Sequence, residues 1–384
     1  MTRGSEMPIR VDREALCARF LSLVAQDNPS FDERAMADEV KRQLGGLGIE
    51  VLEDGAAARI QGTAGNLYAR LPGVGALAKA EPIAFCAHLD SVAPACGKHA
   101  VLHPDGRITS EGDTVLGADD LSAVAAMIEI ARLLRESGVA HRPLEMIFTV
   151  CEEPYTLGSR AIDQTELPLQ AKKIFVPDLT GAVGTAALAA PTIMAVTVSV
   201  TGRAAHAGFA PEKGIHAIAV AARALSALTL GRVDEETTVG IGTIHGGTVS
   251  NAVPDRCELS GEIRGYDDAR VREEFEKIRA AFEREAAVVG ATVELTSERR
   301  TLAYAVEPDA PIVTMFQRAC CRSGVSMQTV RTFGGSDANT FAAWGREVLV
   351  VANAMSEIHS TKEYTTVDEL CRLGGLLLAL ATQA

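Results

Sequence analysis

The sequence lacks features of a membrane or secreted protein. No apolar run approaches the roughly 18 residues that a membrane crossing needs, and the N-terminal MTRGSEMPIRVDRE has no apolar stretch that could form a signal-peptide core. It also lacks a basic surplus, because 37 Lys and Arg stand against 50 Asp and Glu, for a formal net charge of −13. We therefore expect neither a membrane nor a nucleic acid as a partner.

The eight cysteines include no CxxC pair, and several lie in apolar runs such as 83–87. This pattern is typical of buried thiols in a reducing compartment, so we expect a cytoplasmic protein. The composition, 47% apolar and 23% charged, is that of an ordinary globular protein. At 384 residues the chain is longer than the roughly 250–300 residues at which one core stops growing, which predicts two domains or a large insertion.

Hydrophobic periodicity predicts an α/β fold in which helices and short buried strands alternate. The expected helices of this part lie at 12–26, 33–47, 121–134 and about 337–344, and the expected strands at 83–88, 145–150, 174–176 and 347–351. A capping box, Thr366-Val367-Asp368-Glu369, predicts the start of a final helix.

The pattern changes after Pro191. There, strands and helices at 193–200, 214–228, 238–244, 256–264 and 267–288 follow one another in the order βαββα. We predict a discontinuous zinc-exopeptidase-like catalytic domain, a mixed sheet flanked by helices, formed by residues 1–192 and 301–384. Residues 193–300 are predicted to be an inserted α+β lid or dimerisation domain.

Candidate metal ligands begin with His88-Leu89-Asp90 at the end of a predicted strand. Residues i and i+2 of a strand share a face. Asp90 can therefore hold one ring nitrogen of His88 while the other nitrogen binds a metal. Taken alone, this motif is better explained by a histidine that is merely hydrogen-bonded at a strand end.

Two pairs of neighbouring carboxylates stand at the ends of other predicted elements. Asp119 and Asp120 precede a helix, where acids also serve as caps and complement the helix dipole. Glu152 and Glu153 follow an apolar strand. Carboxylates this close repel each other unless one is protonated or cations compensate them, although a solvated pair at a strand end is an equal alternative.

Two more candidates complete the set: Asp178 follows the run 174–176, and His359 follows the strand 347–351. Four or five strand-end segments thus each supply one or two His, Asp or Glu side chains. Sites in open α/β sheets form outside the carboxyl ends of the strands. The simpler alternatives would all have to hold at once, so the combined pattern predicts a metal centre.

The motifs HLD, GADD, CEE, PD, GGSDAN and EIHS, in this order and spacing, resemble the peptidase T-like branch of the co-catalytic zinc exopeptidases. That family includes aminotripeptidases, carboxypeptidases, aminoacylases and desuccinylases. The resemblance runs from about residue 83 to 370 and includes GRAAHAGFAPEKGIHAI in the predicted insertion. It implies a hydrolase that cleaves amide bonds of small peptides.

The resemblance also implies two divalent metal ions per subunit. Asp119 would bridge them, His88 and Asp178 would complete one site, and Glu153 and His359 would complete the other. Zinc is the first expectation, and cobalt or manganese also suits mixed imidazole and carboxylate ligands.

Further roles follow from the same resemblance. Glu152 would be the general base, Asp90 would orient His88, and His206 would donate a hydrogen bond to the oxyanion. In relatives this last histidine reaches the active site of the neighbouring subunit, which implies a homodimer. A lid histidine without a catalytic role is the alternative.

Substrate contacts are expected in two places. Asn251 and Arg264 match substrate-holding positions of the lid, and Arg264 would fork a substrate carboxylate. The amides at Gly334 and Gly335 are expected to bind a carboxylate or a carbonyl. A surface ion pair and an ordinary glycine turn are the respective alternatives.

The sequence departs from the family pattern at two positions. Leu121 replaces the usual lysine after the acid pair, and Pro154 replaces a small residue, which we expect to reshape the pocket floor. The resemblance implies a cis peptide bond between Asp119 and Asp120.

The predicted function is that of a di- or tripeptide aminopeptidase. An N-acyl or N-carbamoyl amino acid amidohydrolase, or a carboxypeptidase, would use the same metals. A non-catalytic binding protein has no need of a base such as Glu152 beside its ligands. A cysteine hydrolase based on Cys151 is disfavoured, because the adjacent glutamates would raise the thiol pKa.

Overall fold

The computed structural model describes residues 9–383, which form two compact units. The first unit comprises 9–188, 305–332 and 336–383, and the second comprises 189–304 and 333–335. The boundaries between the two units lie at 188/189 and 304/305. The sequence had predicted them four residues away, at 192/193 and 300/301. The predicted outer limits at residues 1 and 384 lie outside the described residues.

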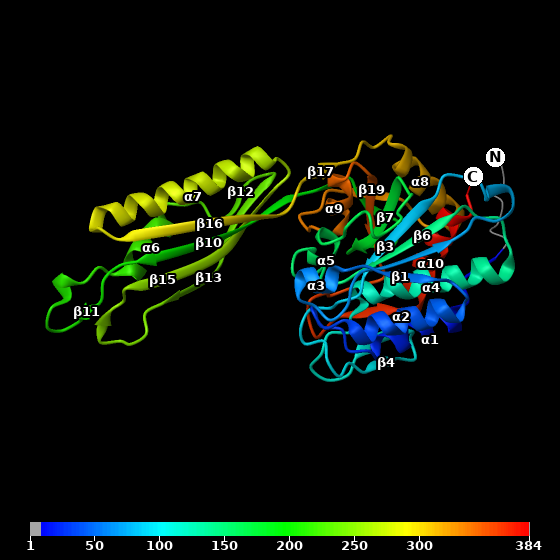
Figure 1. The fold of residues 1–384 in the computed structure, drawn as a ribbon, viewed down its shortest axis with the longest axis horizontal. Coiled ribbons are helices and arrows are strands. Elements are labelled where there is room, and N and C mark those ends of the chain that lie inside the picture. Colours follow the sequence, from blue (N-terminus) through cyan, green and yellow to red (C-terminus); the bar gives the residue numbers. More distant parts are fainter. Residues whose placement is uncertain (1–8, 384) are drawn as a thin grey trace. The chain divides into compact units, whose positions relative to one another are not determined.

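An eight-stranded mixed sheet organises the first unit (Figure 1). In spatial order its strands are β1 (Val51–Glu53), β2 (Leu67–Leu71), β6 (Leu144–Thr149), β3 (Ile83–His88), β7 (Lys173–Leu179), β19 (Glu347–Ala352), β8 (Thr185–Ala187) and β18 (Gln328–Val330). The four strands β6, β3, β7 and β19 run parallel to one another. Their carboxyl ends therefore meet at one edge of the sheet.

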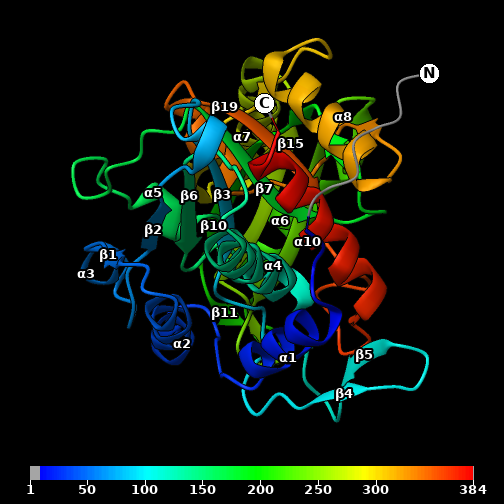
Figure 2. The same ribbon diagram turned by 90° about the vertical axis from the view of Figure 1, so that its right-hand side faces the viewer.

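Helices cover both faces of this sheet. On one face lie α1 (Arg13–Val24), α4 (Ala118–Ser137), α8 (Pro311–Ser323) and α10 (Val367–Ala381), of which α1, α4 and α10 pack against one another (Figure 2). Phe85 and Phe175 project into this layer, and Phe175 stacks on Phe316 of α8 with ring centroids 6.5 Å apart. Cys86 points to the other face, where its Sγ lies 4.0 Å from Asp337 at the start of α9 (Asp337–Ala343).

Burial on both faces explains why the central strands read as short apolar runs. Every residue of β3 and of β6 is buried. Strands covered on both sides need apolar residues at successive positions, in contrast to the alternation of half-exposed strands. The remaining helices of this unit are α2 (Arg34–Gly46), α3 (Ala56–Ile60) and α5 (Leu157–Arg160). No helix within 9–383 has the length and apolar character required to span a bilayer.

Smaller elements complete the first unit. A three-stranded sheet joins β4 (Ala100–Leu102), β5 (Arg107–Ser110) and β20 (Tyr364–Thr366). The helix α10 begins at the predicted capping box, where Thr366 accepts a hydrogen bond from the Glu369 backbone N–H. All eight cysteines fall within the described residues, and they form no disulfide.

The second unit is a five-stranded antiparallel sheet with two helices on one face. Its strands, in spatial order, are β12 (Gly231–Asp234), β13 (Thr237–Gly246), β15 (Arg256–Gly265), β10 (Thr192–Thr201) and β16 (Thr292–Thr301). The helices are α6 (Ala217–Ser226) and α7 (Asp268–Val289). Val196, Val198 and Val200 of β10 pack with Phe275 and Phe282 of α7 in a core of their own.

The edge strands β12 and β16 were not predicted from the sequence. Most residues of β16 are polar or charged and exposed, because an edge strand with one open face buries few side chains. The strand therefore lacks the apolar signal that identified β10, in which buried and exposed residues alternate.

Candidate metal centre

The metal-centre candidates converge at the carboxyl edge of the parallel strands. His88 ends β3, Glu152 and Glu153 follow β6, and Asp178 lies near the end of β7. His359 is in the loop after β19. The parallel register of these strands brings residues that are up to 271 positions apart (359 minus 88) to one place.

Asp119 lies between the two histidines. Its Oδ1 is 3.1 Å from His88 Nε2, and its Oδ2 is 3.3 Å from His359 Nε2. His359 Nε2 is also 3.1 Å from Glu153 Oε2. One carboxylate thus presents one oxygen to each side of the cluster, which is the arrangement that a bridging metal ligand requires.

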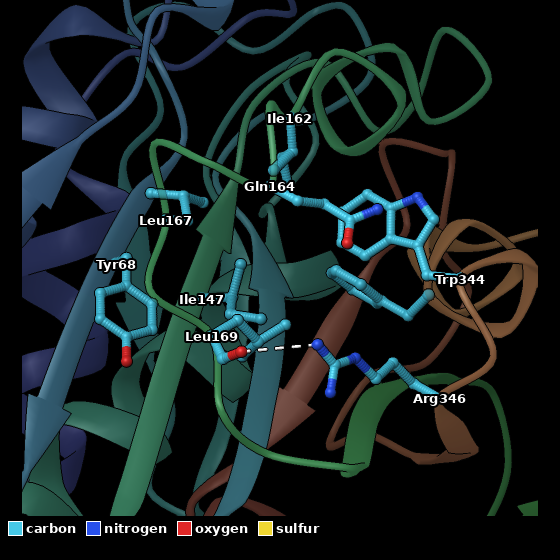
Figure 3. Close-up of a pocket in the computed structure, with 9 residues that line it drawn as sticks. Tyr68, Ile147, Ile162, Gln164, Leu167, Leu169, Trp344 and Arg346 are labelled. Carbon is cyan, nitrogen blue, oxygen red and sulfur yellow. Dashed lines mark hydrogen bonds between the residues drawn. The ribbon is translucent and has the colours of Figure 1, made fainter.

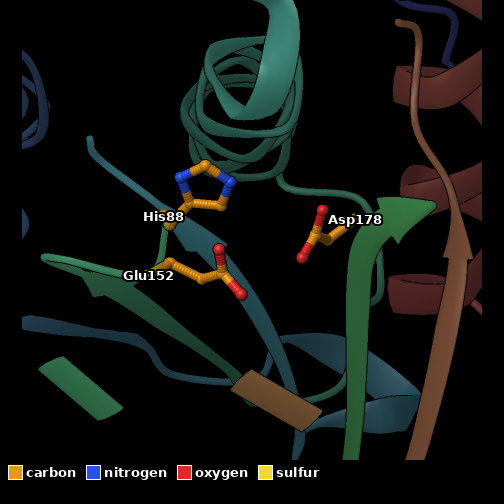
Figure 4. A group of neighbouring side chains, drawn as sticks. All are labelled: His88, Glu152 and Asp178. Carbon is orange, nitrogen blue, oxygen red and sulfur yellow. The ribbon is translucent and has the colours of Figure 1, made fainter. Parts of the chain in front are cut away.

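The structure contains two groups of three side chains whose potential ligand atoms, within each group, all lie within 4.8 Å of one another. One contains His88, Asp119 and Glu153, and the other contains His88, Glu152 and Asp178. In Figure 4 the carboxylates of Glu152 and Asp178 point toward each other from different strands, beside the His88 ring. The grouping places Glu152 next to His88 and Asp178, the ligands expected for one ion.

The tautomer of His88 also fits metal binding. Its Nδ1 is 2.9 Å from the carbonyl oxygen of Asp90 and 3.5 Å from Asp90 Oδ1. Because a carbonyl only accepts, Nδ1 carries the proton of this bond, and Nε2 is the atom that faces Asp119. The backbone carbonyl of Asp90 therefore makes the shorter contact with His88. The sequence had suggested that the Asp90 side chain would hold this ring.

The Asp90 side chain holds the backbone of the two glutamates. Its Oδ1 accepts a hydrogen bond from the Glu152 N–H at 2.9 Å, and its Oδ2 accepts one from the Glu153 N–H at 3.2 Å. The preceding N–H, of Cys151, donates to the buried carboxylate of Glu33 at 3.0 Å. Three consecutive amides are thus fixed by two carboxylates, and this fixes the direction of both glutamate side chains.

The cluster carries more negative charge than its surroundings compensate. Burial raises the pKa of Glu152, Glu153 and Asp178, and neighbouring carboxylates raise it further. Burial also acts on Asp119, but hydrogen bonds from His359 and His88 outweigh it and lower the pKa of this bridging carboxylate. The same contacts with Asp119 and Glu153 raise the pKa of His359 to about 10.

These observations match the donor set of a divalent metal site. Glu153 Oε1 is buried, and no other group within 9–383 hydrogen-bonds to it. Several buried carboxylates with raised pKa values gain stability from a cation placed among them. Mixed imidazole and carboxylate ligands suit zinc, cobalt and manganese.

The backbone around Asp119 has the geometry that the family resemblance implied. The peptide bond between Asp119 and Asp120 is cis. Asp120 is fully buried, and it accepts hydrogen bonds from the His88 N–H at 3.1 Å and from the Asn353 side chain. Non-helical dihedral angles at these two aspartates interrupt the start of α4, so the regular helix begins at Leu121.

Comparison with known proteins decides the family. The chain is 33% identical over 374 residues to the uncharacterized protein YqjE of Bacillus subtilis, a match that covers 97% of this chain and 99% of the relative. The crystal structure of aminopeptidase PepT from Bacillus cereus shares 34% identity and a TM-score of 0.87 over 97% of this chain and 98% of that one. A tripeptidase from Staphylococcus aureus shares 30% identity and a TM-score of 0.92 over 97% and 99%.

The chain belongs to the peptidase T-like family of metal-dependent exopeptidases. Family models agree with this, since a peptidase dimerisation domain matches residues 188–289 and peptidase family M28 matches residues 66–221. The expectation of a peptide-bond hydrolase with an α/β catalytic fold and an inserted α+β domain is therefore confirmed.

The two residues that depart from the family pattern, Leu121 and Pro154, lie in different surroundings. Leu121 is fully buried in the core of the first unit. Pro154 lies in a turn that begins at Glu153, and the next two residues, Tyr155 and Thr156, have positive φ angles of 66° and 57°. The residues after the two glutamates thus turn away sharply from the end of β6.

Five predicted site residues belong to the second unit, and three of them lie on or beside its strands. His206, in the short strand β11 (Ala205–His206), is exposed, and its ring lies 4.3 Å from that of Phe209. Asn251 is exposed beside β14 (Ala252–Val253), which pairs with β11. Arg264 on β15 donates to Glu262 at 2.7 Å and to the Phe333 carbonyl at 2.8 Å.

Of the two predicted glycines, Gly335 is closely packed against other residues of the second unit. A Cβ added to Gly335 would lie 2.9 Å from Ile193 Cδ1 and 3.0 Å from Thr301 Cγ2. Close packing therefore gives a structural reason for glycine at this position. Gly334 precedes it in the same segment, and α9 begins at Asp337, two residues after Gly335.

Three buried polar residues near the metal centre were not predicted. Glu363 accepts the N–H groups of Gly117 and Asp119, Lys98 lies beside the same segment, and Asp337 accepts from Thr149 at the end of β6. Glu363 follows the predicted ligand His359 by four residues, and this proximity in the sequence was the one signal that could have indicated Glu363 as a site residue. Burial raises the pKa of Glu363 to about 7 and lowers that of Lys98 to about 8.

A separate cavity of about 30 Å³ lies away from the metal centre (Figure 3). Its lining includes Tyr68, Ile147, Phe341 and Trp344, and Arg346 donates to the Leu169 carbonyl beside it at 3.4 Å. This volume has room for about one or two water molecules. None of the predicted ligands lines it, so the cavity is no candidate for the peptide site.

Proposed function

We propose that this protein is an aminopeptidase of di- and tripeptides that uses two divalent metal ions, with zinc as the first candidate. The observation that carries the proposal is the position of Asp119, whose two oxygens face His88 Nε2 at 3.1 Å and His359 Nε2 at 3.3 Å. A carboxylate in this position suits two ions, one on each side.

The proposed ligands divide into two sets around Asp119. His88 and Asp178 would hold one ion, and Glu153 and His359 would hold the other. Support comes from the 3.1 Å approach of His359 to Glu153 and from the grouping of His88 with Asp178. Two bound divalent ions would polarise a water molecule and the substrate carbonyl.

Glu152 is the proposed general base. Its carboxyl group is buried beside His88 and Asp178, and its backbone is fixed by Asp90. In this role it accepts a proton from the attacking water and returns it to the leaving amine. A raised pKa brings a carboxylate closer to the working pH, which suits a group that must both take and give a proton.

The second unit has the proposed role of lid and dimerisation domain. The match of residues 188–289 to a peptidase dimerisation domain supports a homodimer. His206 is an exposed imidazole, as a residue that serves a partner subunit must be. We propose that it stabilises the oxyanion in the partner's site. The eight free thiols support a reducing, cytoplasmic environment.

Three substrates distinguish the aminopeptidase from the alternative acylase or carboxypeptidase. The protein, loaded with zinc or cobalt, is incubated with a tripeptide, its N-acetyl derivative and its C-terminal amide, and the products are identified by mass. An aminopeptidase releases the first residue of the free tripeptide and leaves the N-acetyl derivative intact. Hydrolysis of the N-acetyl derivative at a comparable rate would assign the protein to the acylases or carboxypeptidases.

A base variant tests the mechanism separately. Glu152→Gln should lose turnover by about 10²–10⁴-fold while retaining both metal ions. Glu145→Gln is a matched control, because Glu145 is also buried but lies at the opposite end of β6. Near-normal kcat in Glu152→Gln with both ions bound would remove Glu152 from the role of base.

A further inference from the structure

We propose that Glu363 is a positioning residue that fixes the bridging ligand Asp119 through its backbone and thereby sets the affinity of the metal centre. The inference rests on the proposed function, in which Asp119 binds both ions. Glu363 would not touch a metal or the substrate in this role.

The contacts of Glu363 are directed at one short segment. Its side chain is 2% exposed, its Oε2 accepts the Gly117 N–H at 2.7 Å, and its Oε1 accepts the Asp119 N–H at 2.9 Å. Both oxygens of one carboxylate therefore hold amides on either side of Ala118. Hydrogen bonds to a charged acceptor are among the stronger ones in proteins.

Other side chains pack closely against the same segment. The Ser91 hydroxyl donates to the carbonyl of Asp119 at 3.4 Å. A Cβ added to Gly117, which has a φ of 77°, would lie 2.9 Å from Ser91 Oγ and 3.2 Å from Lys98 Nζ. The segment is thus held by Glu363 and confined by Ser91 and Lys98.

This arrangement reaches both polar groups of the Asp119 backbone. Glu363 binds its N–H and Ser91 binds its carbonyl, so the direction in which its side chain leaves the backbone is fixed. The carboxylate must place one oxygen toward His88 and the other toward His359. A small rotation of the backbone would move both oxygens at once, and both metal sites would weaken.

A purely structural role is the competing explanation, and the chain offers a matched control. Glu145 is also fully buried, and its carboxylate accepts the N–H groups of Gln170 and Ala171 at 3.0 and 2.8 Å. It lies near the start of β6, at the end away from the metal centre. Glu363→Gln turns an NH₂ group toward one of its two N–H partners, because the two oxygens of Glu363 accept different amides. Glu145→Gln likewise replaces a buried carboxylate that binds backbone amides, but Glu145 Oε2 accepts both N–H groups, so this variant controls for the loss of a buried charge.

The experiment measures the affinity of the folded protein for Zn²⁺ by competition with a chromogenic chelator, together with the thermal unfolding of the metal-free protein. We expect Glu363→Gln to bind zinc about 10- to 100-fold more weakly than wild type, the range typical of residues that orient metal ligands. Glu145→Gln should lose thermal stability and keep wild-type zinc affinity. If Glu363→Gln fails to fold, Glu363→Asp is measured in the same way, because it keeps both oxygens but is one methylene shorter.

Zinc affinity equal to wild type in the Glu363 variant, or an equal loss in both variants, would overturn the positioning role. Failure of wild-type protein to bind zinc, cobalt or manganese would instead refute the proposed metal centre itself. The two failures are therefore distinguishable.

Discussion

Replacement of Asp90 by asparagine should separate the positioning of the catalytic segment from the stability of the fold. Asp90 is fully buried, and its two oxygens accept the amides of Glu152 at 2.9 Å and Glu153 at 3.2 Å. Its Oδ2 also accepts the Ser30 hydroxyl at 2.7 Å. Asparagine keeps one acceptor and directs a donor at the remaining N–H, so at least one buried donor loses its partner.

The magnitude follows from these contacts. An unsatisfied buried donor costs about 1–3 kcal/mol. The same loss frees the backbone that directs both glutamates, and a misplacement of about 1 Å at a reacting group lowers rates by about 10²-fold. We therefore expect Asp90→Asn to lose about 1–3 kcal/mol of stability and about 10- to 100-fold in kcat.

The assay compares Asp90→Asn with Glu145→Gln for peptide hydrolysis, metal content and urea unfolding. Glu145→Gln should lose comparable stability with little change in kcat, because its carboxylate holds a loop remote from the metal centre. Equal kcat in both variants would show that the Asp90 carboxylate merely stabilises the fold. A normal kcat in Asp90→Asn would refute the reasoning even if stability fell as expected.

Three further predictions concern the dimer, the metals and the substrate. Mixing inactive His206→Ala subunits with inactive Glu152→Gln subunits should restore activity, since each heterodimer then holds one intact composite site; no recovery despite demonstrated subunit exchange would contradict a role across the dimer. Metal removal by a chelator should lower the unfolding temperature more at pH 8 than at pH 6, as measured by calorimetry. The reason is that hydrogen bonds with Asp119 and Glu153 raise the pKa of His359 to about 10 in the folded metal-free protein, above the unfolded value of about 6.5, so this protein loses stability as the pH rises between these two values; an equal effect at both pH values would contradict it. Arg264→Ala and Arg264→Lys should each lose about 10- to 100-fold in kcat/KM for a free tripeptide but not for its C-terminal amide; equal wild-type hydrolysis of acid and amide would exclude a carboxylate contact.

The sequence was most informative where residues are buried on both sides. The run 83–88 predicted β3 with its observed bounds, because a buried parallel strand must be apolar at successive positions. The exposed edge strand β16 carries no such pattern and was missed. Parallel strands bring their carboxyl ends together, so acids and histidines after successive strands indicated the cluster before any distance was known.

The residues that support the ligands could not be recognised in this way. Glu363 binds the backbone of Asp119, 244 positions earlier in the chain, and Glu33 binds the backbone of Cys151, 118 positions later. A contact with a backbone amide places no demand on the side chain of the partner residue. The sequence therefore carries no paired signal for such contacts, and only the fold reveals which amides need an acceptor.

The supporting carboxylates differ from the proposed ligands in their hydrogen bonds. Asp90 and Glu363 each accept two backbone N–H groups of the segments that carry the proposed ligands, and Glu33 accepts one, from Cys151. Backbone amides thus solvate these buried acids and hold the loops in return. The proposed ligands Glu153 and Asp178 have raised pKa values, and Glu153 keeps an oxygen without a hydrogen-bond partner in the described chain. A buried carboxylate oxygen that no group of the described chain satisfies thus lies where two cations are proposed to bind, as expected of a metal ligand.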